Sequence, residues 1–274
     1  MRDKLPKCNS GGERGTIALC QDELEDGILD ILEGIEYGLA VSEQIDEKQL
    51  VKISIDEAII FRSTFQILHR AADLFSKDSI LLEIPLTSSL IIVGNLDGQL
   101  SDLLVVLRTN GLPPKTDYLF LGGYLDRENQ SRYQIEILLL LLLMKLRWPS
   151  HIYLLRGCQE IFDCNYECGF IKLCNDTYGN NSTYSLFSET FDVMPIAAII
   201  ADSLLCCHGG LSQWMTSRDN IRQIPRPTYR DRMKMLDRCL MTDILWSTPS
   251  KFQRLYANFV SNLKFIAIKQ KYSE

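Results

Sequence analysis

The sequence has no excess of basic residues. It carries 29 lysines and arginines against 35 aspartates and glutamates, for a net charge of −6. A nucleic-acid-binding protein needs a basic face that neutralises phosphates, and this balance argues against one. The remaining composition, 46% hydrophobic and 23% charged, is ordinary for a globular protein. We therefore expect no nucleic-acid partner.

A hydrophobic run long enough to cross a membrane is also missing. The only candidate, Ile135 to Met144, is interrupted by Glu136 and closed by Lys145 and Arg147. It falls well short of the ~20 apolar residues that a spanning helix needs. The run predicts a buried helix, and we expect no membrane partner.

The nine cysteines lack the pattern of a disulfide framework. Their number is odd, the chain is long and no signal peptide precedes them. Cys158, Cys164, Cys168 and Cys174 also lack the paired C-x-x-C spacing of structural zinc modules, so packed thiols are favoured over a zinc site. Reduced thiols indicate a cytoplasmic or nuclear protein.

Four buried runs of β type each end in glycine and polar residues. In α/β sheets, chemistry lies at the carboxyl ends of the strands, so these stretches predict one composite site for a metal or a phosphate. The stretches are Gly94-Asn-Leu-Asp-Gly98, Gly122-Gly-Tyr-Leu-Asp-Arg-Glu128, Arg156-Gly-Cys-Gln-Glu160 and His208-Gly-Gly210.

The order and spacing of these stretches resemble those of the metal-dependent serine/threonine phosphoprotein phosphatases, most closely the type-1 branch. That family carries G-D-x-H-G, G-D-x-V-D-R-G, R-G-N-H-E and H-G-G in the same order. The similarity covers roughly residues 27 to 250. It continues through Gly111-Leu-Pro-Pro114, Met194-Pro-Ile-Ala-Ala-Ile199 and Ile244-Leu-Trp-Ser247.

The resemblance implies a calcineurin-like metallophosphoesterase fold of the α/β (α+β) class. Its expected form is a two-sheet β-sandwich flanked by helices, with the site at one edge and the C-terminal strands missing. We expect a mobile N-terminal tail over residues 1–22, a truncated phosphatase-like domain over 23–250 and a divergent C-terminal tail over 251–274.

Hydrophobic periodicity places the individual elements. It predicts helices over residues 26–39 and 46–74. Farther along, strands alternate with helices, which indicates a parallel or mixed sheet. In the C-terminal tail it predicts a helix over 252–263 and a short strand from Phe265 to Ile268 that pack back on the domain. The expected strands are 81–85, 90–94, 117–121, 151–155, 196–200 and 203–207, and the helices between them are 98–109, 130–147 and 183–191.

Several metal-ligand positions implied by the resemblance are occupied by other residues. Asn95 and Asp97 replace the first Asp and His, and Asn95 offers only a neutral carbonyl, whereas Asp97 remains a hard-oxygen ligand of a different shape. At the position where the family has the aspartate that bridges both cations, this sequence has Gly123, which has no side chain. Because two-metal hydrolysis needs a bridging ligand, this is the most damaging single change.

The remaining motif positions are partly replaced and partly kept. Cys158 replaces an amide ligand and suits a softer metal, and Gln159 replaces the proposed general acid and cannot transfer a proton at neutral pH. His208 keeps the family ligand. Asp126 and Arg127 also remain, and Arg127 matches the family's phosphate-binding arginine. With the metals gone, a structural ion pair between Asp126 and Arg127 is favoured over phosphate binding.

These positions favour a catalytically dead pseudophosphatase that acts, if at all, by binding phosphoproteins or regulatory proteins. On this hypothesis no metal is bound tightly. The alternative is a weakly active phosphatase acting on phosphoserine or phosphothreonine with divalent Mn, Fe or Zn, held by Asn95, Asp97, Cys158 and His208. A non-functional duplicate or an incomplete gene product stays open as a third possibility.

Overall fold

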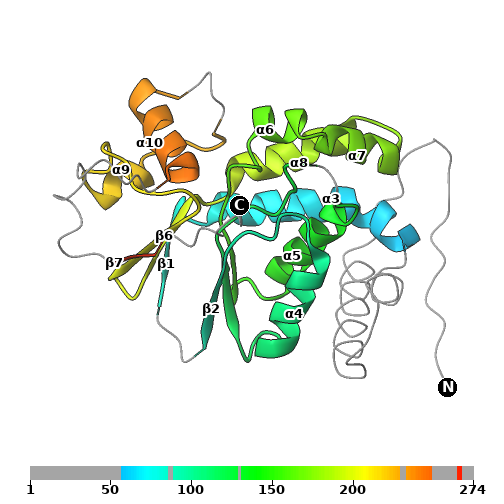
Figure 1. The fold of residues 1–274 in the computed structure, drawn as a ribbon, viewed down its shortest axis with the longest axis horizontal. Helices are drawn as coiled ribbons and strands as arrows, with labels where there is room; N and C mark the ends of the chain where they lie inside the picture. Colours follow the sequence, from blue (N-terminus) through cyan, green and yellow to red (C-terminus); the bar gives the residue numbers. More distant parts are fainter. Residues whose placement is uncertain (1–56, 86–88, 129–130, 229–232, 249–263, 267–274) are drawn as a thin grey trace, which may run out of the picture.

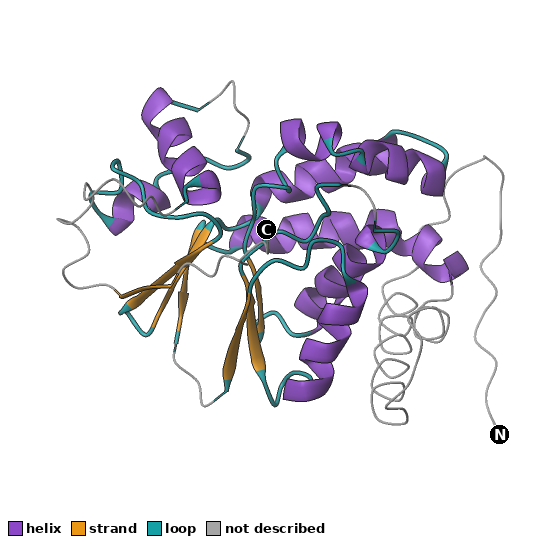
Figure 2. Ribbon diagram, viewed as in Figure 1, coloured by secondary structure: helices purple, strands orange, loops and turns teal. Residues whose placement is uncertain are grey.

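The computed structural model describes residues 57–85, 89–128, 131–228, 233–248 and 264–266. These residues form two β-sheets that face each other, with helices on both outer sides (Figures 1 and 2). The expected two-sheet sandwich flanked by helices is confirmed. The expected N-terminal tail and the helices predicted over 26–39 and 252–263 lie outside the described residues.

The first sheet is three-stranded and parallel. Its order is β2 (Leu90–Val93), β3 (Asp117–Phe120) and β4 (Ile152–Leu154). Parallel neighbours need a crossover connection, which α4 (Leu100–Asn110) and α5 (Gln134–Arg147) supply. The carboxyl ends of all three strands therefore meet at one edge of the sheet.

The second sheet is mixed and has the order β1 (Leu81–Ile84), β5 (Ala197–Ile200), β6 (Leu204–Cys207) and β7 (Lys264–Ile266). β1 pairs with β5 in parallel, β5 with β6 in antiparallel fashion, and β6 with β7 in parallel. The short strand predicted in the C-terminal tail is thus present, at the edge of this sheet.

The two sheets bury one face of β1 to β6 between them. Side chains alternate along a strand, so Leu119 and Leu121 face the second sheet, whereas Tyr118 and Phe120 face the helices. Because both faces are largely covered, most residues of β1 to β6 are apolar, with Glu83 in β1 and Asp117 in β3 as exceptions. The inter-sheet cluster consists of Leu82, Ile84, Leu119, Leu121, Leu155, Ala198, Ile200 and Cys206.

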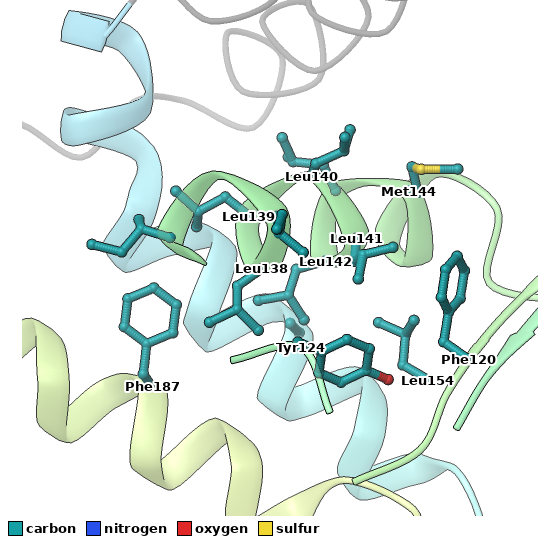
Figure 3. Packing of buried hydrophobic residues seen from close by; sticks show 14 of the residues in the cluster. Phe120, Tyr124, Leu138, Leu139, Leu140, Leu141, Leu142, Met144, Leu154 and Phe187 are labelled. Atoms are coloured by element: carbon teal, nitrogen blue, oxygen red, sulfur yellow. The ribbon is translucent and has the colours of Figure 1, made fainter. Parts of the chain in front are cut away.

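A larger hydrophobic core lies between the first sheet and a layer of helices. It involves α3 (Glu57–Lys77), α4, α5, α7 (Phe170–Tyr178) and α8 (Ser182–Val193). α5 lies in its centre, and its run of leucines is buried on all sides, which explains the apolar run in the sequence (Figure 3). Across the described ranges, no helix combines the length and apolar character needed to span a bilayer.

The outer face of the second sheet is covered by α9 (Arg218–Arg222) and α10 (Met235–Trp246). α9, α10 and the two helices α6 (Phe162–Glu167) and α7 were not predicted from the sequence. α6 has only six residues, too few for a periodic signal. The sequence of α7 did carry a helical pattern, because its buried residues Phe170, Cys174 and Tyr178 are spaced four apart.

Candidate functional site

The loops that follow β2 and β3 are joined by backbone hydrogen bonds, and the side chain of Glu160 joins the loop after β4 to them. The amides of Leu96 and Asp97 donate to the carbonyl of Gly123 at 2.9 and 3.0 Å, and the amide of Gly98 donates to Tyr124 at 3.0 Å. The predicted convergence of these strand ends is therefore present. The loop after β6 joins them through His208, described below.

A buried carboxylate, that of Glu160, organises the two later loops. Its Oε2 accepts the amides of Gly123 and Gly157 at 2.9 and 2.8 Å, and its Oε1 accepts those of Tyr124 and Leu125 at 2.9 and 3.3 Å. Glu160 is fully buried, so these four donors have no access to water. Its role is to fix the loops, which the sequence did not assign although the residue lies in a motif.

Two glycines allow the loops to approach backbone to backbone. A Cβ on Gly122 would lie 2.3 Å from the amide nitrogen of Gly157, and a Cβ on Gly157 would lie 2.3 Å from the amide nitrogen of Gly123. No larger residue fits at either position without moving backbone. The glycines of the second and third motifs are therefore required by packing.

Asn95 and Asp97 lie next to each other on the first loop. Nδ2 of Asn95 donates to Oδ1 of Asp97 at 3.2 Å. Burial raises the pKa of Asp97 above its usual range, and the hydrogen bond from Asn95 opposes this shift. Asp97 also has a φ of 44°, a left-handed conformation that aspartate tolerates better than most residues.

Cys158 connects three other predicted site residues. Its Sγ accepts a hydrogen bond from Nη2 of Arg127 at 3.2 Å and lies 3.2 Å from Nε2 of His208. The thiol also lies 3.1 Å from Oε1 of Gln159, to which it can donate. The structure thus brings Arg127, Cys158, Gln159 and His208 together in one polar cluster.

Burial sets the protonation of this cluster. It raises the pKa of Cys158, and the hydrogen bond from Arg127 opposes that rise. Burial lowers the pKa of His208, which the nearby Glu160 carboxylate opposes. At neutral pH the cluster therefore contains a thiol and a neutral imidazole, since each of these forms avoids an unsolvated charge.

Asp126 and Arg127 have separate described contacts. The carboxylate of Asp126 accepts the amides of Glu128 and Ser131 at 2.9 and 2.8 Å, which shapes the loop before α5. The exposed Arg127 donates to Cys158, and its guanidinium lies 6.0 Å from the ring centroid of Trp246. The ion pair between Asp126 and Arg127 that the sequence favoured stays a prediction.

The described residues do not fit a centre with two cations. Within them, no group of three or more His, Cys, Asp or Glu side chains is arranged to hold a metal ion. The space beside Gly123 is taken by Asn95, because a Cβ on Gly123 would lie 2.8 Å from Cγ of Asn95. His208 and Cys158, which could each bind a soft metal, instead contact each other.

The fold and the loop arrangement are those of a phosphoesterase-type sandwich with its strand-end site. The family model for calcineurin-like phosphoesterases matches residues 71–265, so the chain belongs to that family. Among solved structures, the chain is similar to a serine/threonine phosphatase from Saccharomyces cerevisiae with similarity to human phosphatase PP5. The two share 24% identity with a TM-score of 0.62, over 74% of this chain and 65% of that one.

Proposed function

We propose that this protein is a pseudophosphatase of the serine/threonine phosphoprotein phosphatase group, related most closely to its type-1 branch. It binds phosphorylated or regulatory proteins and does not hydrolyse them. The observation that carries the proposal is the position of Gly123: it supplies no bridging ligand, and Asn95 fills the adjacent space. Without a bridging group, two cations cannot be held at the short separation that this hydrolysis needs.

The cluster around Cys158 supports the same conclusion. Gln159 has no titratable proton with which to assist a leaving group. His208 is held against Cys158, and both are uncharged at neutral pH. A thiol in place of a thiolate is a poor ligand even for a soft cation.

The cluster offers hydrogen-bond donors for a phosphorylated side chain. Arg127 is exposed and its guanidinium can donate two parallel hydrogen bonds to a phosphate. Within the described part of the chain, the buried Nε2 of Gln159 has no hydrogen-bond acceptor. An oxyanion beside Cys158 would satisfy that donor, so Arg127 and Gln159 are the residues that we assign to recognition.

The first experiment measures metal and hydrolysis together. The protein is purified from cells supplemented with Mn, Fe and Zn, and metal content is determined by mass spectrometry alongside hydrolysis of an aryl phosphate. We expect fewer than one metal per chain and the same rate for wild type and His208→Ala. Nearly two metals per chain, or hydrolysis abolished in His208→Ala, would establish the weakly active phosphatase instead.

The second experiment tests binding in the presence of a chelator. Phosphoserine and phosphothreonine peptides are compared with their unphosphorylated forms by calorimetry. We expect phosphate-dependent binding that weakens about tenfold or more in Arg127→Ala and in Gln159→Leu, since each loses a hydrogen bond to a charged group. The matched control is Arg132→Ala, which removes an exposed arginine from the following loop. Equal affinity for both peptide forms would refute the assigned recognition.

A further inference from the structure

We propose that the side chain of Asn95 occupies the space of a side chain at position 123, so that the strand-end loops pack together at this point without a metal ion. This Asn95–Gly123 pair is a structural unit, because a side chain at position 123 requires a change at Asn95. The inference concerns what fills the site, and it does not depend on whether the protein binds phosphate.

Three atoms of the Asn95 carboxamide lie close to the place where a Cβ on Gly123 would be. A Cβ on Gly123 would lie 2.8 Å from Cγ of Asn95 and 3.0 Å from each of its Nδ2 and Oδ1 atoms. The separation of 2.8 Å is shorter than real Cβ contacts, and the two of 3.0 Å are tighter than nearly all of them, so the Asn95 side chain would have to shift. The Asn95 side chain therefore lies directly over the Cα of Gly123.

Gly123 cannot move away to relieve such a contact, because both of its backbone polar groups are fixed. Its amide donates to Glu160 at 2.9 Å, and its carbonyl accepts the amides of Leu96 and Asp97. Its φ of +76° is a left-handed conformation that costs other residues energy. Any side chain at 123 must therefore displace Asn95 and break its hydrogen bond to Asp97.

In this arrangement, the glycine at position 123 and the asparagine at position 95 depend on each other. Reintroducing a side chain at 123 while Asn95 remains would disturb the junction of three loops. The same substitution with a small residue at 95 would meet an open space. The two positions should therefore be strongly coupled in stability, as residues in direct contact are.

The experiment is a double-mutant cycle followed by thermal unfolding in a chelator. The variants are Gly123→Ala, Asn95→Ala and their combination. The chain offers a matched glycine control in Gly179, whose φ is +71° and where an added Cβ would meet no atom within 4 Å. Asn110→Ala is the control for Asn95→Ala, because Asn110 also makes one short-range hydrogen bond, to the carbonyl of Val106.

We expect Gly179→Ala to lower the Tm by about 2–4 °C, which reflects backbone strain alone. Gly123→Ala should lower it by at least twice as much. In the Asn95→Ala background, the further effect of Gly123→Ala should shrink to that of Gly179→Ala. The wild-type Tm should be the same with chelator and with added Mn or Zn, because no metal contributes to the loops.

Three results would overturn the proposal. One is an equal loss in Gly123→Ala and Gly179→Ala. Another is an effect of Gly123→Ala that is unchanged when Asn95 is alanine. The third is a wild-type Tm that rises with metal. If Gly123→Ala alone is insoluble, the double variant decides: its recovery as folded protein supports the pair, and its failure rejects it. None of these readouts involves hydrolysis or phosphopeptide binding, so they stand apart from the proposed function.

Discussion

Nη2 of Arg156 lies 2.7 Å from Oδ1 of Asp192, and both side chains are largely buried. The arginine of the third motif therefore points to α8 and away from the cluster around Cys158. Its Nε also donates to the carbonyl of Glu160 at 3.1 Å, and Nη1 donates to the hydroxyl of Thr228. The side chain thus joins the site loop to the helical layer and to the segment before α10.

Arg156→Lys should destabilise the protein although it keeps the charge. A lysine ammonium cannot reproduce the three directions of the guanidinium fork, so buried acceptors would lose their donors. We expect a loss of about 3 kcal/mol in the free energy of unfolding, measured in urea. The control is Arg218→Ala, which removes an exposed ion pair with Asp202 and should leave the urea midpoint unchanged. Equal midpoints for wild type and Arg156→Lys would contradict this account.

Glu160→Gln should also destabilise the protein, because an amide group can accept hydrogen bonds on one side only. Two of the four amides that Glu160 now accepts would face an NH2 group. Leaving two buried donors unpaired costs roughly 2–5 kcal/mol. The matched control, Glu167→Gln, changes an exposed glutamate at the end of α6. If the two variants unfold at the same urea concentration, Glu160 does not fix the loops.

Stability should fall at alkaline pH in a way that depends on Cys174. Burial raises the pKa of this thiol from 9.0 to about 12, so the folded state keeps it protonated while the unfolded chain ionises it. The stabilisation of the folded state by the protonated Cys174 thiol is fully present below pH 9 and is lost as the pH rises toward 12. Cys174→Val removes the titration, so its stability should fall less steeply over this window, by about 1.4 kcal/mol per pH unit. Parallel curves for the two proteins would disprove the assignment.

Removing residues 251–274 should expose an edge of the second sheet. β7 pairs in parallel with β6 through Leu204–Lys264, Leu205–Phe265 and Cys206–Ile266. Without β7, the unpaired edge of β6 becomes available to other chains. We expect a lower Tm or insoluble protein, which differential scanning fluorimetry and a solubility assay would detect. A soluble deletion variant with an unchanged Tm would mean that β7 contributes nothing to the sheet.

Much of the fold followed from the sequence because β1 to β6 are largely buried between the two sheets and the helices. A buried strand is recognisable in a sequence as a short apolar run. All six strands predicted before the C-terminal tail are present. The crossover helices were predictable because parallel strands need them. The helices α6 and α10 were not, since α6 is shorter than two turns and α10 exposes apolar residues such as Met235 and Leu236.

For the site, the sequence by itself determined which residues gather at the strand ends and which ligand types are absent. Asn95, Gly123, Cys158 and Gln159 were each identified from their motif position. Only the tertiary structure decided their contacts: Asn95 covers Gly123, and Cys158 joins Arg127 to His208. These contacts connect residues that lie up to 50 positions apart, and short-range patterns carry no information about such packing.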